Sequence, residues 1–342
     1  MTTEPRPTTR FTGPGWVAPG VVLAAAPWTW FLLRDMTPIM DVAAVALPLM
    51  ASAAGCAAAV VAGVRRSPLP TLVAASFAAF TLVAVLGPRV PIRDEAPVRP
   101  VRLASANVYE RNRNEGSARA LLDQGADVLV VIEGAPAIGD GLAGAYPYLI
   151  QEGFLSVRSS FPARELSSGA ALNGARLLRV RIWGPSGPFV LYALHSLNPL
   201  YDAAFDAQLG FLQDLLGRIE RESQPVVIAG DFNMSDRSQG YRLVTGSLND
   251  AMRAGWARST YSSGPWQVLF LRIDYIFTTP SWCAADAVRF DVPGSDHEGV
   301  ATTIGPCPGV PIPEAPTTDT PPPPSSSSPS SSSSTTPSAA TP

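Results

Sequence analysis

Two histidines occur in the 342-residue sequence, and each stands beside an apolar run. His195 follows the run 189–194, and His297 precedes the run 300–304. Carboxylate and amide side chains stand at, or close to, the ends of other apolar runs: Asn107, Glu133, Asp231, Asn233, Asp274 and Asp296. An imidazole can move protons near neutral pH, and oxygen ligands suit hard divalent cations. Each residue alone is compatible with a turn or a cap, but both histidines in the same kind of position indicate a catalytic site.

Regular hydrophobic patterns predict the elements that position these side chains. Strands are predicted at residues 101–108, 127–132, 154–157, 177–183, 189–194, 226–229, 272–277 and 300–304, and helices at 115–124 and 203–222. Strands and helices alternate irregularly, with hairpin-like neighbours, which indicates an α/β domain with mixed sheets. Strand ends on such a sheet hold side chains in fixed positions, as a preorganised site requires.

Six short motifs follow one another along residues 101–305: Ala106-Asn107-Val108, Ile132-Glu133, Ala193-Leu194-His195-Ser196, Gly230-Asp231-Phe232-Asn233, Ile273-Asp274-Tyr275-Ile276 and Ser295-Asp296-His297. In these motifs the chain resembles the endonuclease/exonuclease/phosphatase superfamily of metal-dependent phosphoesterases. The resemblance implies a four-layer sandwich, with helices outside two face-to-face mixed β-sheets and the active site at one edge. One departure is Glu298-Gly299, because the family usually has proline two residues after the final histidine. Another is the segment 153–162, a weak match to the family's central strand.

The resemblance also implies roles for individual residues. Glu133, helped by Asn107, is expected to bind Mg²⁺ or Mn²⁺, and Asp296 is expected to belong to the same metal site. His297 is expected to act as the general base that activates water, with Asp274 fixing its tautomer.

The expected site is completed by Asp231, Asn233 and His195. Asp231 and Asn233 are expected to complete the metal shell or to position water. Asn233 and His195 are expected to donate hydrogen bonds to phosphoryl oxygens, where charge grows during the reaction. Glu152 is either a carboxylate partner of His195 or an ordinary surface residue.

Three long uncharged stretches precede this domain, at residues 15–33, 42–64 and 67–88. Each is long enough for a helix across a hydrocarbon core of about 30 Å, whereas a soluble helical domain would have to bury all three. We therefore expect a tail at 1–14, three transmembrane helices within 15–90 and a linker at 91–100. Basic residues lie in the tail before the first span and between the second and third spans, which predicts that both segments are cytoplasmic: Arg6, Arg10, Arg65 and Arg66. Three spans then place the domain outside the cell, on a multi-pass protein of the plasma membrane.

The C-terminal segment 306–342 consists mostly of Pro, Ser and Thr and cannot form a core. It is expected to be disordered, either as a plain tail or as an O-glycosylated stalk. Cys283 and Cys307 flank the end of the domain, and they either pair in an oxidising compartment or remain two thiols.

The sequence leaves more than one substrate class open. A net charge of −3 argues against a strongly basic nucleic-acid surface, although arginines at 111, 113 and 158 fall near expected site loops. A nuclease-like phosphodiesterase is the first expectation, and a lipid or soluble phosphodiester is the alternative. Aromatic residues before Asp274 either form an apolar lip or pack in the core: Trp256, Trp266 and Phe270. A noncatalytic binding module of the same fold is a third reading, and no protein partner is implied.

Overall fold

A computed structural model describes residues 17–34, 39–65, 68–92, 95–170, 175–199, 205–264, 270–311 and 320–323. Several positions used in the sequence analysis lie outside these ranges: Arg6, Arg10, Arg66, Trp266 and most of the tail 306–342.

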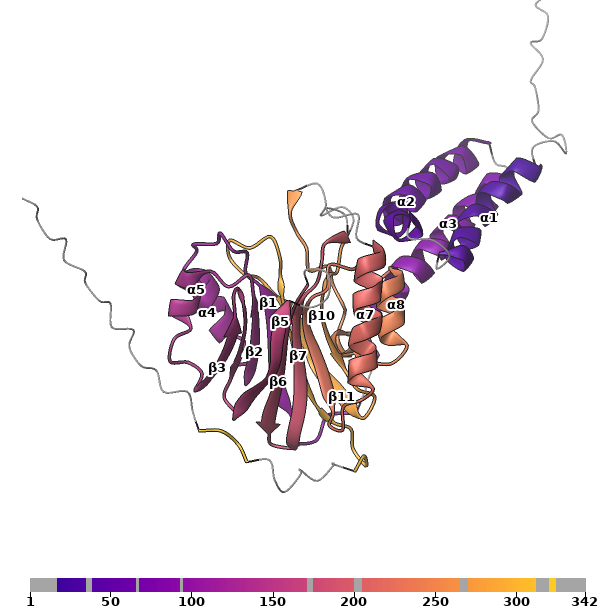
Figure 1. Ribbon diagram of the computed structural model, residues 1–342. Helices are drawn as coiled ribbons and strands as arrows, with labels where there is room; N and C mark the ends of the chain where they lie inside the picture. The colour runs from indigo at the N-terminus through magenta and orange to yellow at the C-terminus, as the bar shows by residue number, and fades with distance from the viewer. Residues whose placement is uncertain are drawn as a thin grey trace, which may run out of the picture.

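Two six-stranded mixed sheets form the centre of the domain (Figure 1). The first has the order β11-β12-β1-β2-β4-β3, with bounds Trp282–Phe290, Gly299–Pro306, Val101–Asn107, Val128–Ile132, Leu155–Ser159 and Tyr148–Glu152. The second has the order β5-β6-β7-β8-β10-β9, with bounds Ala163–Ala170, Arg176–Gly184, Gly187–His195, Val226–Asp231, Asp274–Thr278 and Asn249–Asp250. In each sheet one central pair is parallel, β1 with β2 and β7 with β8, and the other pairs are antiparallel.

Helices cover the outer face of each sheet. α4 (Gly116–Leu122) and α5 (Pro136–Gly141) pack on the first sheet through Leu121 and Ile138. α7 (Phe205–Ile219) and α8 (Gln239–Thr245) pack on the second sheet (Figure 1). Between the sheets, fully buried aliphatic side chains interdigitate: Leu103, Val130, Leu178, Leu191 and Ile276. The four-layer arrangement of two mixed sheets between helices is the one expected from the sequence.

At Gly230 the strand β8 leaves no room for a side chain beside β7. The φ of Gly230, +152°, is rarely adopted by other residues, and a Cβ there would lie 2.0 Å from the carbonyl oxygen of Leu194. No side chain fits between the two backbones at this point. Gly230 therefore allows β8 to hold Asp231 directly opposite His195 in the parallel register.

Cys283 and Cys307 form a disulfide, with 4.9 Å between their Cα atoms. Cys283 lies in the edge strand β11, and Cys307 follows the last residue of β12. Of the two alternatives left open by the sequence, the structure shows the paired one.

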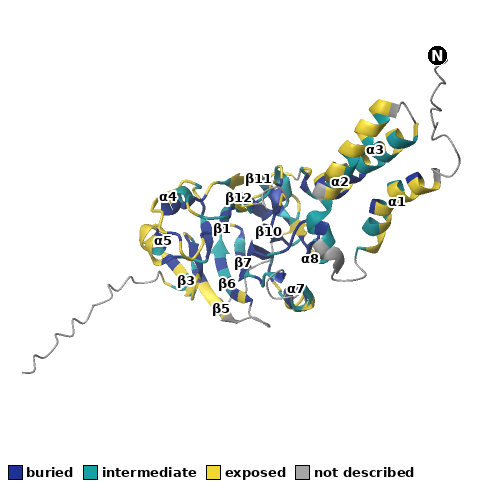
Figure 2. Cartoon of the chain, turned by 90° about the horizontal axis from the view of Figure 1, so that it is seen from above, coloured by how far each residue is buried: buried dark blue, intermediate teal, exposed yellow. Residues whose placement is uncertain are grey.

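Three apolar helices precede the domain: α1 (Val17–Leu33), α2 (Ile39–Arg65) and α3 (Pro68–Thr81), the last continued by a π-helical turn (Leu82–Leu86) and a 3₁₀ turn (Gly87–Arg89). Much of their surface is exposed, whereas the strands of the domain are mostly buried (Figure 2). Within the described residues, 43–64 and 68–89 form helices long and apolar enough to cross a membrane, and 18–33 is a shorter apolar helix. Three spans are therefore not confirmed.

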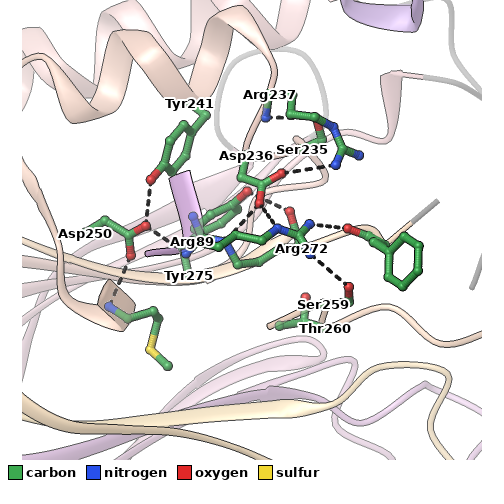
Figure 3. Close-up of polar contacts among 12 residues, drawn as sticks. Arg89, Ser235, Asp236, Arg237, Tyr241, Asp250, Ser259, Thr260, Arg272 and Tyr275 are labelled. Carbon is green, nitrogen blue, oxygen red and sulfur yellow. Dashed lines mark hydrogen bonds and ion pairs between the residues drawn. The ribbon is translucent and has the colours of Figure 1, made fainter. Parts of the chain in front are cut away.

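The end of this helical segment is anchored in the domain by Arg89 (Figure 3). The Arg89 side chain is 9 % exposed, and its Nε lies 2.7 Å from Oδ2 of the fully buried Asp236. Arg89 also donates hydrogen bonds to Ser259 Oγ and to the carbonyl oxygen of Phe270. Arg237 reaches in the opposite direction, from the domain to the carbonyl oxygen of Ala44 in α2, at 3.0 Å.

Candidate active site

Strand ends of both sheets meet at one place and bring polar side chains together. Asn107 ends β1, and Glu133 follows β2 in the first sheet. Asp231 ends β8 in the second sheet. The Asn107 amide nitrogen donates to Glu133 Oε1 at 3.1 Å and to Asp231 Oδ2 at 3.1 Å. A single amide therefore joins carboxylates from the two sheets.

His297 and Asp274 form a buried pair beside this group. His297 Nδ1 lies 3.0 Å from Asp274 Oδ2, and the two side chains are 7 % and 0 % exposed. The other ring nitrogen, Nε2, is 3.9 Å from Asp231 Oδ2. A carboxylate at Nδ1 holds the proton on that nitrogen, so that in the neutral ring Nε2 is the proton acceptor. The basic nitrogen of His297 thus faces the carboxylates of the site.

Burial and the neighbouring charges both shift the pKa values of this pair. Burial lowers the pKa of His297, but the Asp274 and Asp231 carboxylates outweigh it and raise that pKa above its usual value. Burial also raises the pKa of Asp274 above its usual value, although His297 opposes the shift. Both shifts follow from negative charges confined in a poorly solvated space.

His195 also approaches the carboxylates. Its Nε2 is 3.6 Å from Glu133 Oε1 and 3.7 Å from Asp231 Oδ2. Glu152 pairs with Leu155 across the β3–β4 hairpin, and in the described part of the chain no ion pair joins it to His195. The structure therefore brings His195 to the site but gives Glu152 no contact with it.

Asn233 and Glu133 both have a left-handed backbone, with φ of +49° and +53°. The backbone N–H of Asn233 donates to Asp231 Oδ1 at 2.9 Å, and the side-chain Nδ2 of Asn233 donates to the carbonyl oxygen of Ser196 at 3.0 Å. Glu133 Oε2 accepts from the backbone N–H of Glu110 at 3.2 Å. Such backbone strain in non-glycine residues is concentrated at functional sites, where surrounding contacts maintain it.

Asp296 is held close to the site by its neighbours. Ser295 Oγ donates to the carbonyl oxygen of Asn107 at 2.8 Å, and the backbone N–H of His297 donates to the same Ser295 oxygen. Asp296 stands between these two residues and is partly exposed. Ser295 was not singled out as a site residue in the sequence, because a serine next to a motif carries no chemical signal of its own.

The motifs that meet at this site also identify the family of the chain. A sequence model described as "Endonuclease/Exonuclease/phosphatase family" matches residues 104–297. The match begins just before Asn107 and ends on His297, so it spans every motif of the site. The chain belongs to the endonuclease/exonuclease/phosphatase family. Members of this family hydrolyse phosphoester bonds, and the chain is a phosphoester hydrolase.

Several solved structures are similar to this chain. A family member from Beutenbergia cavernae is 19% identical, with a TM-score of 0.48, over 63% of this chain and 74% of its own. Humanized D. rerio TDP2 is 19% identical, with a TM-score of 0.48, over 61% and 100%. A Bacteroides thetaiotaomicron mannosyl-6-phosphatase is 17% identical, with a TM-score of 0.43, over 60% and 99%. No curated protein matches the sequence significantly.

The donor set of this endonuclease/exonuclease/phosphatase site fits a hard divalent cation. Glu133 and Asp231 approach the same amide, and in the described residues no arginine pairs with either carboxylate. Asp231, Asp274 and His297 also offer ligand atoms within 4.8 Å of one another. Asp274 and His297 already hydrogen-bond each other, however, so the oxygens of Glu133, Asp231 and Asn107 are better placed to hold the ion.

A cavity of about 370 Å³ adjoins the carboxylates of the endonuclease/exonuclease/phosphatase site. Glu133 and His195 form its polar wall, and Tyr109, Phe154 and Arg176 form much of the rest. The Arg176 guanidinium lies 5.8 Å from the centre of the Phe154 ring. Neither residue was singled out in the sequence, because both lie outside the family motifs.

Two expectations about substrate contacts change. Arg158 is 7 % exposed and donates to the carbonyl oxygens of Gly139 and Leu142, so it is a structural residue beneath α5 and not a contact at the site edge. Trp256 and Phe270 are 62 % and 55 % exposed, so of the two alternatives left open by the sequence, packing in the core is wrong for these two residues. The structure therefore removes one basic group from a nucleic-acid surface and leaves two aromatic side chains exposed.

Proposed function

We propose that the chain is a membrane-anchored, divalent-metal-dependent phosphodiesterase whose catalytic domain lies outside the cytoplasm. The observation that carries the proposal is the orientation of His297, with Nδ1 on Asp274 and Nε2 toward Asp231. A bound Mg²⁺ or Mn²⁺ would supply positive charge against a phosphoryl oxygen, and Glu133, Asn107, Asp231 and Asp296 would hold it.

The protein's own groups would carry the proton transfers. His297 Nε2 accepts a proton from water, while Asp274 stabilises the imidazolium that forms. Asn233 and His195 donate hydrogen bonds to the phosphoryl oxygens as their charge grows. These roles follow the family resemblance, and the distances within the site support them.

The proposal is tested on the full-length chain reconstituted in nanodiscs. We expect hydrolysis of bis-p-nitrophenyl phosphate with Mg²⁺ or Mn²⁺, loss of activity with EDTA, and recovery when the metal is added back. Absence of hydrolysis with every divalent metal tried, on this diester and on DNA, RNA and phospholipid, would contradict the proposal.

Replacing Glu133 with Gln should weaken metal binding by at least about 10–100-fold, because even changes to groups around a ligand have effects of this size. Calorimetric titration with Mn²⁺ measures the affinity without reference to turnover. Glu110→Gln is the matched control, since Glu110 lines the same cavity but approaches Glu133 through its backbone N–H. Equal metal affinity in Glu133→Gln and the wild type would remove Glu133 from the metal site.

The membrane orientation gives a further prediction. The Cys283–Cys307 disulfide supports an extracytoplasmic domain, because disulfides are rare in the cytosol. The 17 residues of α1 extend about 26 Å, less than the core of about 30 Å. The proposed orientation has a cytoplasmic N-terminus, which requires α1 to cross the membrane.

Protease added to intact protoplasts should therefore digest the domain and leave an N-terminal epitope tag intact. Digestion of both would mean that α1 does not span, and protection of the domain until lysis would place it in the cytoplasm. A protease site engineered into a known surface protein serves as the positive control.

A further inference from the structure

A groove of about 630 Å³ lies where the α3 segment meets the catalytic domain. Leu86 and Arg89 of the helical segment form part of its wall, and Trp256, Arg258 and Phe270 of the domain form another part. The family match begins only at residue 104, so part of this groove comes from a segment outside the family domain.

The groove has an exposed apolar lining. Leu86, Trp256 and Phe270 are 40 %, 62 % and 55 % exposed, respectively. Leu86 lies close to the end of the candidate span 68–89, so the groove opens where that helix would leave the membrane. Tryptophan is enriched at this depth because its ring is amphipathic. The position of the groove therefore favours a ligand that remains partly in the bilayer.

The groove also contains positive charge. Arg258 is exposed, and within the described residues it has no acidic partner. Arg289, a second lining residue, lies 3.4 Å from Glu298, so its charge is largely neutralised. An unpaired cation beside an apolar surface suits an amphiphile with an anionic headgroup.

One wall of the groove lies against the catalytic pair. Tyr261 lines the groove, and its ring centre is 5.1 Å from that of His297, edge to face. The next lining residue, Ser262, donates its backbone N–H to the carbonyl oxygen of Asp296 at 2.9 Å. A ligand in the groove is thus separated from the catalytic imidazole by a single side chain.

We propose that this groove holds a membrane phospholipid as the substrate, an inference that rests on the proposed phosphodiesterase activity. The acyl region lies along Leu86, Trp256 and Phe270. Arg258 attracts the anionic phosphodiester as the lipid enters the groove, and the phosphodiester then reaches past Tyr261 to the site. Hydrolysis forms a bond between the water oxygen and phosphorus and breaks one ester P–O bond. The proton taken from water is returned to the alcohol that leaves.

The test uses the full-length protein in nanodiscs of phosphatidylglycerol and phosphatidylcholine, with bis-p-nitrophenyl phosphate as a soluble substrate. The variants are Arg258→Ala and the double change Trp256→Ala with Phe270→Ala. We expect kcat/KM on phospholipid to fall about tenfold or more, mostly through KM. The reason is that Trp256 and Phe270 hold the apolar part of the lipid and Arg258 attracts its negative charge, whereas none of the three takes part in the proton transfers. Activity on the soluble diester should stay within about twofold, which also shows that the variants are folded.

Matched controls come from exposed positions away from the groove. Arg119→Ala in α4 removes an exposed arginine, and Leu149→Ala in β3 removes an exposed apolar side chain. Neither should change phospholipid turnover.

Four outcomes would overturn the inference. Wild-type protein that cleaves the soluble diester, DNA or RNA but no phospholipid would refute it and leave the phosphodiesterase proposal intact. Groove variants that lower activity equally on the lipid and the soluble diester would show that the groove does not select lipid, and unchanged lipid kinetics would show that it is not used. Inactivity of the wild type on every substrate would overturn both proposals.

Discussion

His297→Ala should lower kcat on bis-p-nitrophenyl phosphate by about 10²–10⁴-fold, the usual effect of removing a general acid or base. The reason is the orientation of the ring, whose Nδ1 is bound by Asp274 at 3.0 Å while Nε2 faces the carboxylates. Asp274→Asn should give a smaller loss of kcat, because it leaves the base in place and disturbs its tautomer and basicity.

The control for this experiment is metal binding. His297→Ala should retain its affinity for Mn²⁺ in calorimetric titration, whereas Glu133→Gln should not. A general base acts on turnover, so the His297 variant should change kcat much more than KM. Turnover close to that of the wild type would show that another group accepts the proton.

Arg89→Met should destabilise the domain by about 3 kcal/mol, near the lower end of the effect of breaking a buried ion pair. Arg89 Nε lies 2.7 Å from Asp236 Oδ2, and both side chains are buried. The lower end is expected because Arg272 Nε also lies 3.6 Å from the same oxygen, so some positive charge remains (Figure 3). For a domain of about 200 residues this corresponds to a fall in Tm of about 6–12 °C.

Thermal unfolding of the full-length protein in detergent, followed by tryptophan fluorescence, measures the effect. Arg119→Met is the control, because Arg119 forms an exposed pair with Asp123 and should contribute little. Adding Asp236→Asn to Arg89→Met should lower the stability further, because Arg237 and Arg272 lie 3.8 Å and 3.6 Å from the oxygens of the same carboxylate and would lose its charge. An Arg89→Met variant as stable as the control would mean that the junction does not contribute to folding.

The acid dependence of this junction has a definite sign. Burial raises the pKa of Asp236, but Arg89, Arg237 and Arg272 outweigh it, so the pKa lies below its usual value. A carboxylate with a depressed pKa in the folded state stabilises the protein above its unfolded pKa of about 3.9. The stabilisation is lost as the pH falls below that value, and Arg89→Met should reduce the loss.

The eight strands predicted from the sequence are the interior strands of the two sheets, and the four that were missed are the edges: β3, β5, β9 and β11. The difference has a physical cause. β2, which reads Val-Leu-Val-Val-Ile, is covered by a sheet on one face and helices on the other, so every residue is apolar. β5 reads Ala-Arg-Glu-Leu-Ser-Ser-Gly-Ala, because an edge strand needs fewer apolar residues.

The site could be anticipated from the sequence because its residues lie in short motifs at strand ends. What could not be anticipated depends on contacts between distant segments. Arg89 meets Asp236 across 147 positions, and Tyr261 reaches His297 through a bridge between two loops. No local pattern marks either residue, so both the junction and the groove required the folded chain.

The pairing of β1 with β12 has a consequence for when activity can appear. Leu103 near the start of the domain pairs with Thr302 near its end, and His297 lies just before that last strand. The first strand therefore remains without this neighbour, and His297 remains absent, until almost the whole domain has left the ribosome. Such long-range pairing slows folding. It also means that the hydrolase would be inactive throughout its own synthesis and would switch on only when its last strand is in place.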